Sequence, residues 1–146
     1  MVGVVFRGNL WLDGVISSLI EHDDDPDPKS LISKTIKHSK QYSQLHAVML
    51  AKQGLIPDHE LSELASETNV PVIAVLESRP TRHPFKPRQN TNHYWLRVNG
   101  KCVHVLAAGV TKEGAEKMFA IGCTSGAKVP EAVRVAELIL RQAVVD

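Results

Sequence analysis

The sequence is poor in the features that mark secreted, membrane-bound or redox proteins. It has only two cysteines, Cys102 and Cys123, and their separation rules out a CxxC metal or redox pair. No apolar run approaches the roughly 20 residues that a membrane-spanning helix needs. Met1 leads directly into an apolar stretch, without the basic start and cleavage site of a signal peptide. We therefore expect a cytoplasmic protein with no membrane partner and with both thiols free.

Acidic residues are absent from Ser78 to Lys112, although the net charge of the whole chain is only +1. The segment from Asp13 to Asp27 has the opposite character, because its only basic group is a histidine. Such segregation of charge creates a local field that attracts polyanions even when the molecule is nearly neutral. The charge distribution therefore predicts nucleic acid as the partner.

Aromatic residues make up only 5% of the chain, yet several of them lie inside the basic segment. In an extended strand, Trp95 and Arg97 would share one face while Tyr94 faces the core. Single-stranded nucleic acid binds through base stacking combined with phosphate contacts. The predicted nucleic-acid-binding residues in this segment are Arg79, Arg82, Lys86, Arg88, Trp95 and Arg97. The alternative is a basic surface that only keeps the protein soluble.

The hydrophobic pattern predicts a single α/β domain over residues 1–146. Antiparallel hairpins are expected at 2–20 and, around the strong turn signal Asn99-Gly100, at 93–107. Buried strands at 46–50 and 70–76, with a helix between them, predict a parallel pair. Helices are expected to begin at Pro28, where Asp27 provides the cap and the helix runs to near Tyr42, and at Pro57, Thr111 and Pro130. Together these elements predict a mixed sheet with an N-terminal antiparallel hairpin, parallel central strands and flanking helices.

The helix that starts at Pro130 carries two opposite charges one turn apart, Glu131 and Arg134. Its remaining surface is apolar enough to predict burial of Val133, Ala136, Leu138, Ile139 and Leu140. Two interpretations of the charges stay open. They form an ordinary pair within the helix, or the start of the helix lies at a cleft that binds phosphate.

Motifs along nearly the whole chain carry a family resemblance. They are Val2-Gly3-Val4-Val5-Phe6-Arg7-Gly8-Asn9, Leu12-Asp13-Gly14-Val15, Asp23, Pro71-Val72-Ile73 and Val129-Pro130-Glu131 with Arg134-Val135-Ala136. This combination resembles the archaeal family catalogued as domain of unknown function ninety-nine, which is related to endonuclease V. The resemblance implies an RNase H-like fold and a role in the repair of deaminated bases, such as deoxyuridine in DNA.

The resemblance also implies a Mg²⁺ site, because nucleases of this fold hold the metal with several carboxylates. It implies Asp23 as catalytic residue and metal ligand, Asp25 as a second ligand, Glu131 as a supporting acid and Arg134 near the phosphate. The family's first strand, with its Asp pair, would precede Val2, but this sequence begins at Met1. Lys52 stands where endonuclease V has an Asp. The acidic cluster has a simpler interpretation as a solvated loop before a helix cap.

Three functions follow from these observations. The first is a Mg²⁺-dependent endonuclease that acts on deaminated DNA. The second, which we favour, is a catalytically degenerate relative that binds nucleic acid, and the third is an oligomeric structural protein. Absence of the first strand would leave an unpaired strand edge, so we also expect a homodimer or another homo-oligomer.

Overall fold

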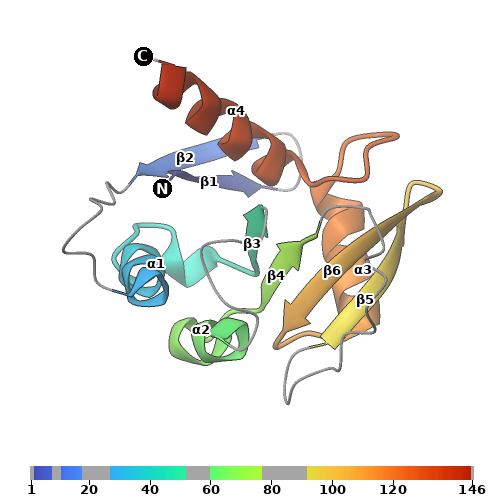
Figure 1. Ribbon diagram of the computed structural model, residues 1–146, viewed down its shortest axis with the longest axis horizontal. Helices are drawn as coiled ribbons and strands as arrows, with labels where there is room; N and C mark the ends of the chain where they lie inside the picture. Colours follow the sequence, from blue (N-terminus) through green and yellow to red (C-terminus); the bar gives the residue numbers. More distant parts are fainter. Residues whose placement is uncertain (1, 8–10, 18–26, 52–59, 77–91, 146) are drawn as a thin grey trace.

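The chain forms a mixed α/β fold in the computed structural model, which describes residues 2–7, 11–17, 27–51, 60–76 and 92–145 (Figure 1). Within these ranges the main sheet has four strands in the order β3-β4-β6-β5. Their bounds are Val48–Ala51 for β3, Val72–Val75 for β4, Asn92–Val98 for β5 and Lys101–Ala108 for β6. Strands β5 and β6 of this sheet form the hairpin that carries the candidate site.

The parallel pair predicted from the sequence is confirmed by β3 and β4, which pair in register from Val48 and Val72 onward. The connection between them contains α2 (Leu61–Thr68), which ends at Asn69 in the left-handed conformation (φ 56°). On its other side β4 pairs antiparallel with β6. The predicted parallel strands are this pair, in which β4 is central and β3 lies at the edge of the described sheet.

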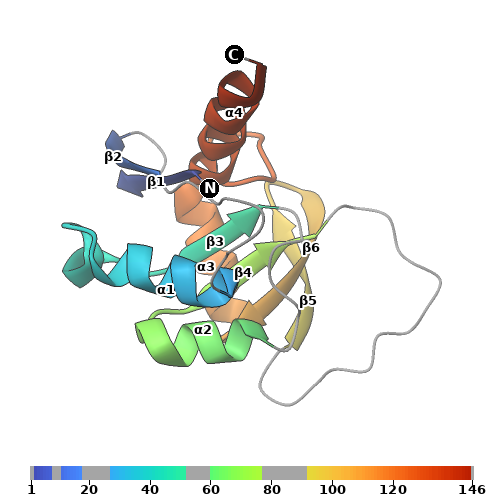
Figure 2. The same cartoon turned by 60° about the vertical axis from the view of Figure 1, so that its left-hand side comes forward.

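The N-terminal hairpin is also confirmed, with β1 (Val2–Arg7) antiparallel to β2 (Trp11–Ser17). Within the described residues it forms a two-stranded sheet of its own, so its predicted place in the main sheet is wrong. Among the described strands, β1 pairs with β2 and not with β3, whose partner is β4. Helix α4 (Glu131–Val145) lies against the hairpin above the main sheet and also contacts β3 (Figures 1 and 2).

Helix α1 (Pro28–Lys37) begins as predicted, because the Asp27 side chain accepts a hydrogen bond from the Lys29 backbone N–H at 3.4 Å. It ends five residues before the predicted end near Tyr42. The backbone N–H of Ser39 bonds to Ile36 at 3.1 Å, which tightens the last turn, and Tyr42 instead opens the short 3₁₀ helix η1 (Tyr42–Gln44). The Lys29 ammonium joins α1 to α2 through Glu63, at 2.5 Å.

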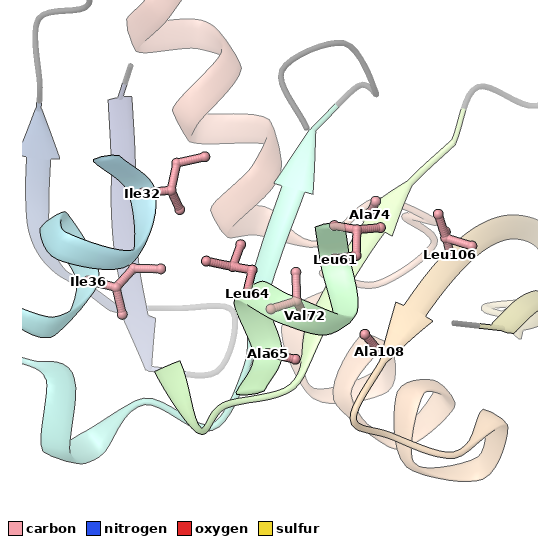
Figure 3. Packing of buried hydrophobic residues seen from close by; sticks show 9 residues of the cluster. All are labelled: Ile32, Ile36, Leu61, Leu64, Ala65, Val72, Ala74, Leu106 and Ala108. Atoms are coloured by element: carbon pink, nitrogen blue, oxygen red, sulfur yellow. The ribbon is translucent and has the colours of Figure 1, made fainter. Parts of the chain in front are cut away.

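Hydrophobic clusters pack on both faces of the main sheet. One cluster joins α1 and α2 to the sheet (Figure 3) and contains Ile32, Ile36, Leu61, Leu64, Ala65, Val72, Ala74, Leu106 and Ala108. The other lies under α3 (Lys112–Gly122), with Ala115 and Phe119 against inward residues of β5 and β6. Thr111 caps α3 by accepting from the Gly114 N–H at 3.1 Å. Leu61, Leu64 and Ala65 of α2 thus face one side of the sheet, and Ala115 and Phe119 of α3 face the other.

The tip of the β5–β6 hairpin fixes the connection between α3 and α4. Asn99 (φ 51°) and Gly100 (φ 74°) both have positive φ, as a primed two-residue turn requires. The Asn99 side-chain amide donates to the backbone carbonyls of Thr124 at 3.1 Å and Ala127 at 2.6 Å. The Lys101 ammonium donates to the Gly126 carbonyl at 3.1 Å. The chain just before α4 is therefore anchored to the hairpin.

The predicted burial of the apolar side of α4 is confirmed for Val133 but wrong for Leu138 and Leu140, each 44% exposed. Side chains two positions apart point about 200° apart around a helix. Burial of both leucines would therefore require packing on opposite sides of α4. Among the described residues, no helix has both the length and the apolar character required to cross a membrane.

Candidate nucleic-acid interface

The β5–β6 hairpin separates its side chains onto two faces, as the alternation in the sequence predicts. Leu96 and Val98 are buried against α3, and Tyr94 packs against the same cluster. Trp95 is 47% exposed, and Arg97 is exposed beside it. A large aromatic ring with nearly half its surface open, next to a guanidinium on the same strand face, suits contact with a base and its phosphate.

The indole of Trp95 does not stand alone, because it stacks on His104. The two residues are directly opposite across the strands. Their ring centroids are 4.6 Å apart and their planes differ by 11°. His104 is absent from the residues predicted from the sequence. Counting outward from the Asn99-Gly100 turn would have found it, since a two-residue turn pairs Trp95 with His104.

A second histidine completes this group. The Nδ1 atom of His93 and the Nε2 atom of His104 are 3.2 Å apart, within hydrogen-bond distance, so one nitrogen donates and the other accepts. Burial lowers the pKa of His104, and positive charge on His93 lowers it further. We call His93, Trp95, Arg97, Cys102 and His104 the hairpin platform.

The two cysteines differ in environment. Cys102 is exposed on the platform, where it pairs across the strands with Arg97. Cys123 is buried in the cluster under α3, and burial raises its pKa to about 11. Only Cys102 therefore adds a reactive group to the open face.

Four predicted nucleic-acid-binding residues, Arg79, Arg82, Lys86 and Arg88, lie outside the described residues. The residues that flank this part of the chain are placed. The Leu76 backbone N–H donates to the His104 carbonyl at 3.0 Å, and Asn92 pairs with Ala107 at the start of β5. The described residues on either side, Leu76 and Asn92, therefore both lie beside β6, which carries His104.

Glu131 and Arg134 show the geometry of a pair within one helix. The guanidinium of Arg134 donates to both carboxylate oxygens, with Nε 2.9 Å from Oε2. The hydrogen bond from Arg134 lowers the pKa of Glu131. Glu131 and Arg134 therefore form an ordinary pair within the helix, which is the first of the two interpretations given above. Both carboxylate oxygens of Glu131 accept hydrogen bonds from Arg134.

The predicted metal ligands Asp23 and Asp25 lie outside the described residues. Across the part of the chain that the structure does describe, no three His, Cys, Asp or Glu side chains are grouped so that they could hold a metal ion. Mg²⁺ prefers an octahedral set of oxygen ligands, and the described residues do not supply one. The described residues therefore do not form a Mg²⁺ site by themselves.

The chain is similar to known proteins in sequence and in fold. The family model described as endonuclease dU matches residues 1–144. A UPF0215 protein of Methanosarcina acetivorans is 33% identical over 160 residues, which cover 95% of this chain and 80% of that protein. A UPF0215 protein of Methanothermobacter thermautotrophicus is 28% identical with 95% and 76% covered. The crystal structure of a protein of unknown function from Archaeoglobus fulgidus superposes with a TM-score of 0.76 at 20% identity, covering 97% of this chain and 88% of that one.

Proposed function

Because the chain belongs to the endonuclease dU family, we propose that it is an endonuclease-related protein that binds single-stranded nucleic acid through the hairpin platform. The proposal includes an RNase H-like fold, which family kinship with endonuclease V suggests. The observation that carries it is the exposed Trp95 ring, stacked on His104 beside Arg97. The platform also lies within a segment, Ser78 to Lys112, that has no acidic residue.

The stack between Trp95 and His104 supports binding through preorganisation. A free tryptophan side chain loses rotamer freedom when a base stacks on it, whereas this indole is already held against an imidazole at 4.6 Å. A base would extend the existing stack by one ring. Arg97 is exposed on the same face, and its guanidinium would supply a phosphate contact that does not depend on base identity.

Replacement of Trp95 by alanine is expected to weaken binding of a single-stranded oligonucleotide by about 1–3 kcal/mol, the usual contribution of one stacked base. Fluorescence anisotropy with a labelled oligonucleotide measures this change at two salt concentrations. The affinity of the unaltered protein should fall steeply with added salt, because phosphate contacts release counterions.

The matched control is Leu138→Ala on α4, since Leu138 is 44% exposed and Trp95 is 47% exposed. This variant should bind like the unaltered protein. Equal affinity of the Trp95→Ala variant, or binding that does not respond to salt, would contradict the proposal.

A second candidate is cleavage of deoxyuridine-containing DNA with Mg²⁺, which the description of the matching family favours. Asp23 and Asp25 would then hold the metal, Glu131 would support them, and Arg134 would lie near the phosphate. Our first proposal treats this chain as catalytically degenerate, because Lys52 replaces a metal-binding acid and Glu131 is paired with Arg134. It therefore predicts no cleavage of a uracil-containing duplex above the level without protein. Mg²⁺-dependent cleavage that Asp23→Ala abolishes would establish the second candidate instead.

A further inference from the structure

His93 and His104 offer a property that Trp95 and Arg97 lack, because histidine is the residue type whose charge can change within the physiological pH range. Their facing nitrogens, 3.2 Å apart, share one hydrogen bond. Both side chains are partly exposed, and the pair lies on the open face of the hairpin. When the accepting nitrogen also gains a proton, two N–H donors face each other, and the shared hydrogen bond is lost unless an acceptor comes between them.

We propose that His93 and His104 form a proton-coupled binding site for a phosphodiester group, next to the stacking surface of Trp95. This inference rests on the proposed function, and it adds how binding at the same face is regulated. On binding, the pair takes up one proton from solvent. The two imidazoles then donate to phosphate oxygens in place of their mutual hydrogen bond.

The spacing along β5 supports a phosphate at this position. His93 and Arg97 lie two residues before and two residues after Trp95, which places each about 7 Å along the strand from it on the same face. A base stacked on Trp95 would therefore have a cationic or protonatable side chain on each side. An arginine guanidinium does not lose its proton in proteins, so the histidine pair would be the source of a pH-dependent interaction with phosphate.

The described charged residues near the pair lie on the hairpin and on or beside α2. Arg97 and Cys102 share its face on β5 and β6. Helix α2 contacts β6 and carries Glu63 and Glu67, which both bind Lys29. Glu60 lies just before this helix. The pKa of His104 is lowered first by burial and then by His93. Both effects disfavour the charged form of His104 in the free protein, and a bound anion would stabilise that form.

The sign of the pH effect follows from these groups. The pKa of His104 in the free protein lies below its ordinary value of 6.5, and a bound phosphate would raise it. Proton uptake on binding makes affinity rise as pH falls, by on the order of tenfold per pH unit for each proton where uptake is complete. Between pH 7.5 and 5.5 we expect binding to tighten about tenfold.

The test measures affinity for a single-stranded oligonucleotide at pH 7.5, 6.5 and 5.5 in the unaltered protein and three variants. His104→Phe keeps a ring to stack on Trp95 but cannot be protonated, and His93→Gln keeps a hydrogen-bonding group without a titratable one. The control is His46→Gln, because His46 is exposed and lies just before β3, at the opposite edge of the main sheet from β5. Circular dichroism checks that each variant is folded, and either platform variant suffices if the other fails to fold.

We expect the unaltered protein and His46→Gln to bind about tenfold more tightly at pH 5.5 than at 7.5, and the platform variants to show less than half of that change on a logarithmic scale. Binding that depends on Trp95 but changes equally with pH in all four proteins would overturn this inference and leave the proposed function standing. Absence of binding at every pH would overturn both. NMR titration of the imidazole protons with and without oligonucleotide gives a second readout, since the pKa of His104 or His93 must rise in the complex.

Discussion

Truncation of Phe119 to alanine is expected to lower the free energy of unfolding by about 3–5 kcal/mol. The Phe119 ring is fully buried between α3 and the inward residues of β5 and β6. Removal of the ring loses its transfer free energy and leaves a cavity that the surrounding strands cannot close. Because a domain of this size has only about 5–15 kcal/mol of stability in total, the change should be large in urea denaturation monitored by circular dichroism.

Ile121 provides the control for Phe119. It lies two residues further along the same helix and is 65% exposed. Its truncation to alanine should change stability by less than about 0.5 kcal/mol. Equal effects of the two variants would mean that α3 does not pack on the sheet with the face described above.

Truncation of Leu64 to alanine should cost about 2–5 kcal/mol, because this side chain is fully buried in the cluster that joins α1 and α2 to the other face of the sheet (Figure 3). Ser66 is exposed on the same helix, and its replacement by alanine serves as the control. The measurement is again the free energy of unfolding from urea titration. A loss below 1 kcal/mol, on the order of one methylene group, would contradict the described packing of α2.

The double variant tests whether the two clusters are independent. Leu64 and Phe119 lie on opposite faces of the sheet and belong to different clusters. Their effects should therefore add to within about 0.5 kcal/mol. A larger deviation would show that the sheet transmits strain from one face to the other.

Local structure could be predicted from the sequence where a short motif sets the backbone conformation. Asn99-Gly100 fixed the second hairpin, because both residues tolerate positive φ. Asp27 and Thr111 marked helix starts, since their side chains cap free backbone N–H groups. In these cases residues within three positions of one another supply the stabilising contacts.

Long-range arrangement was less predictable. Among the described strands, β1 and β3 have no common partner, and no local motif indicates this. The sequence therefore predicts one sheet where the described strands form two. Leu140 is exposed although it is as apolar as buried Val133. Its exposure depends on how far the elements that pack against α4 extend along the helix. Such features are set by tertiary contacts that hydrophobic periodicity does not encode.

The candidate site divides in the same way. Trp95 and Arg97 were predicted because strand alternation places them on one face. His104 was missed because its importance comes from cross-strand pairing. The roles of Asp23 and Asp25, the binding of Mg²⁺ and the homo-oligomer stay predictions, and so does nucleic-acid contact by Arg134.

The contrast between the two thiols makes the protein suited to site-selective labelling. Maleimides react with thiolates, and an exposed thiol begins to ionise at a pH of roughly 7–8. A maleimide fluorophore in this pH range would therefore react with exposed Cys102 and spare buried Cys123, whose pKa is about 11. The dye would sit opposite Arg97, on the strand that carries His104. Without any engineered cysteine, its emission would then report the arrival of a ligand on that surface.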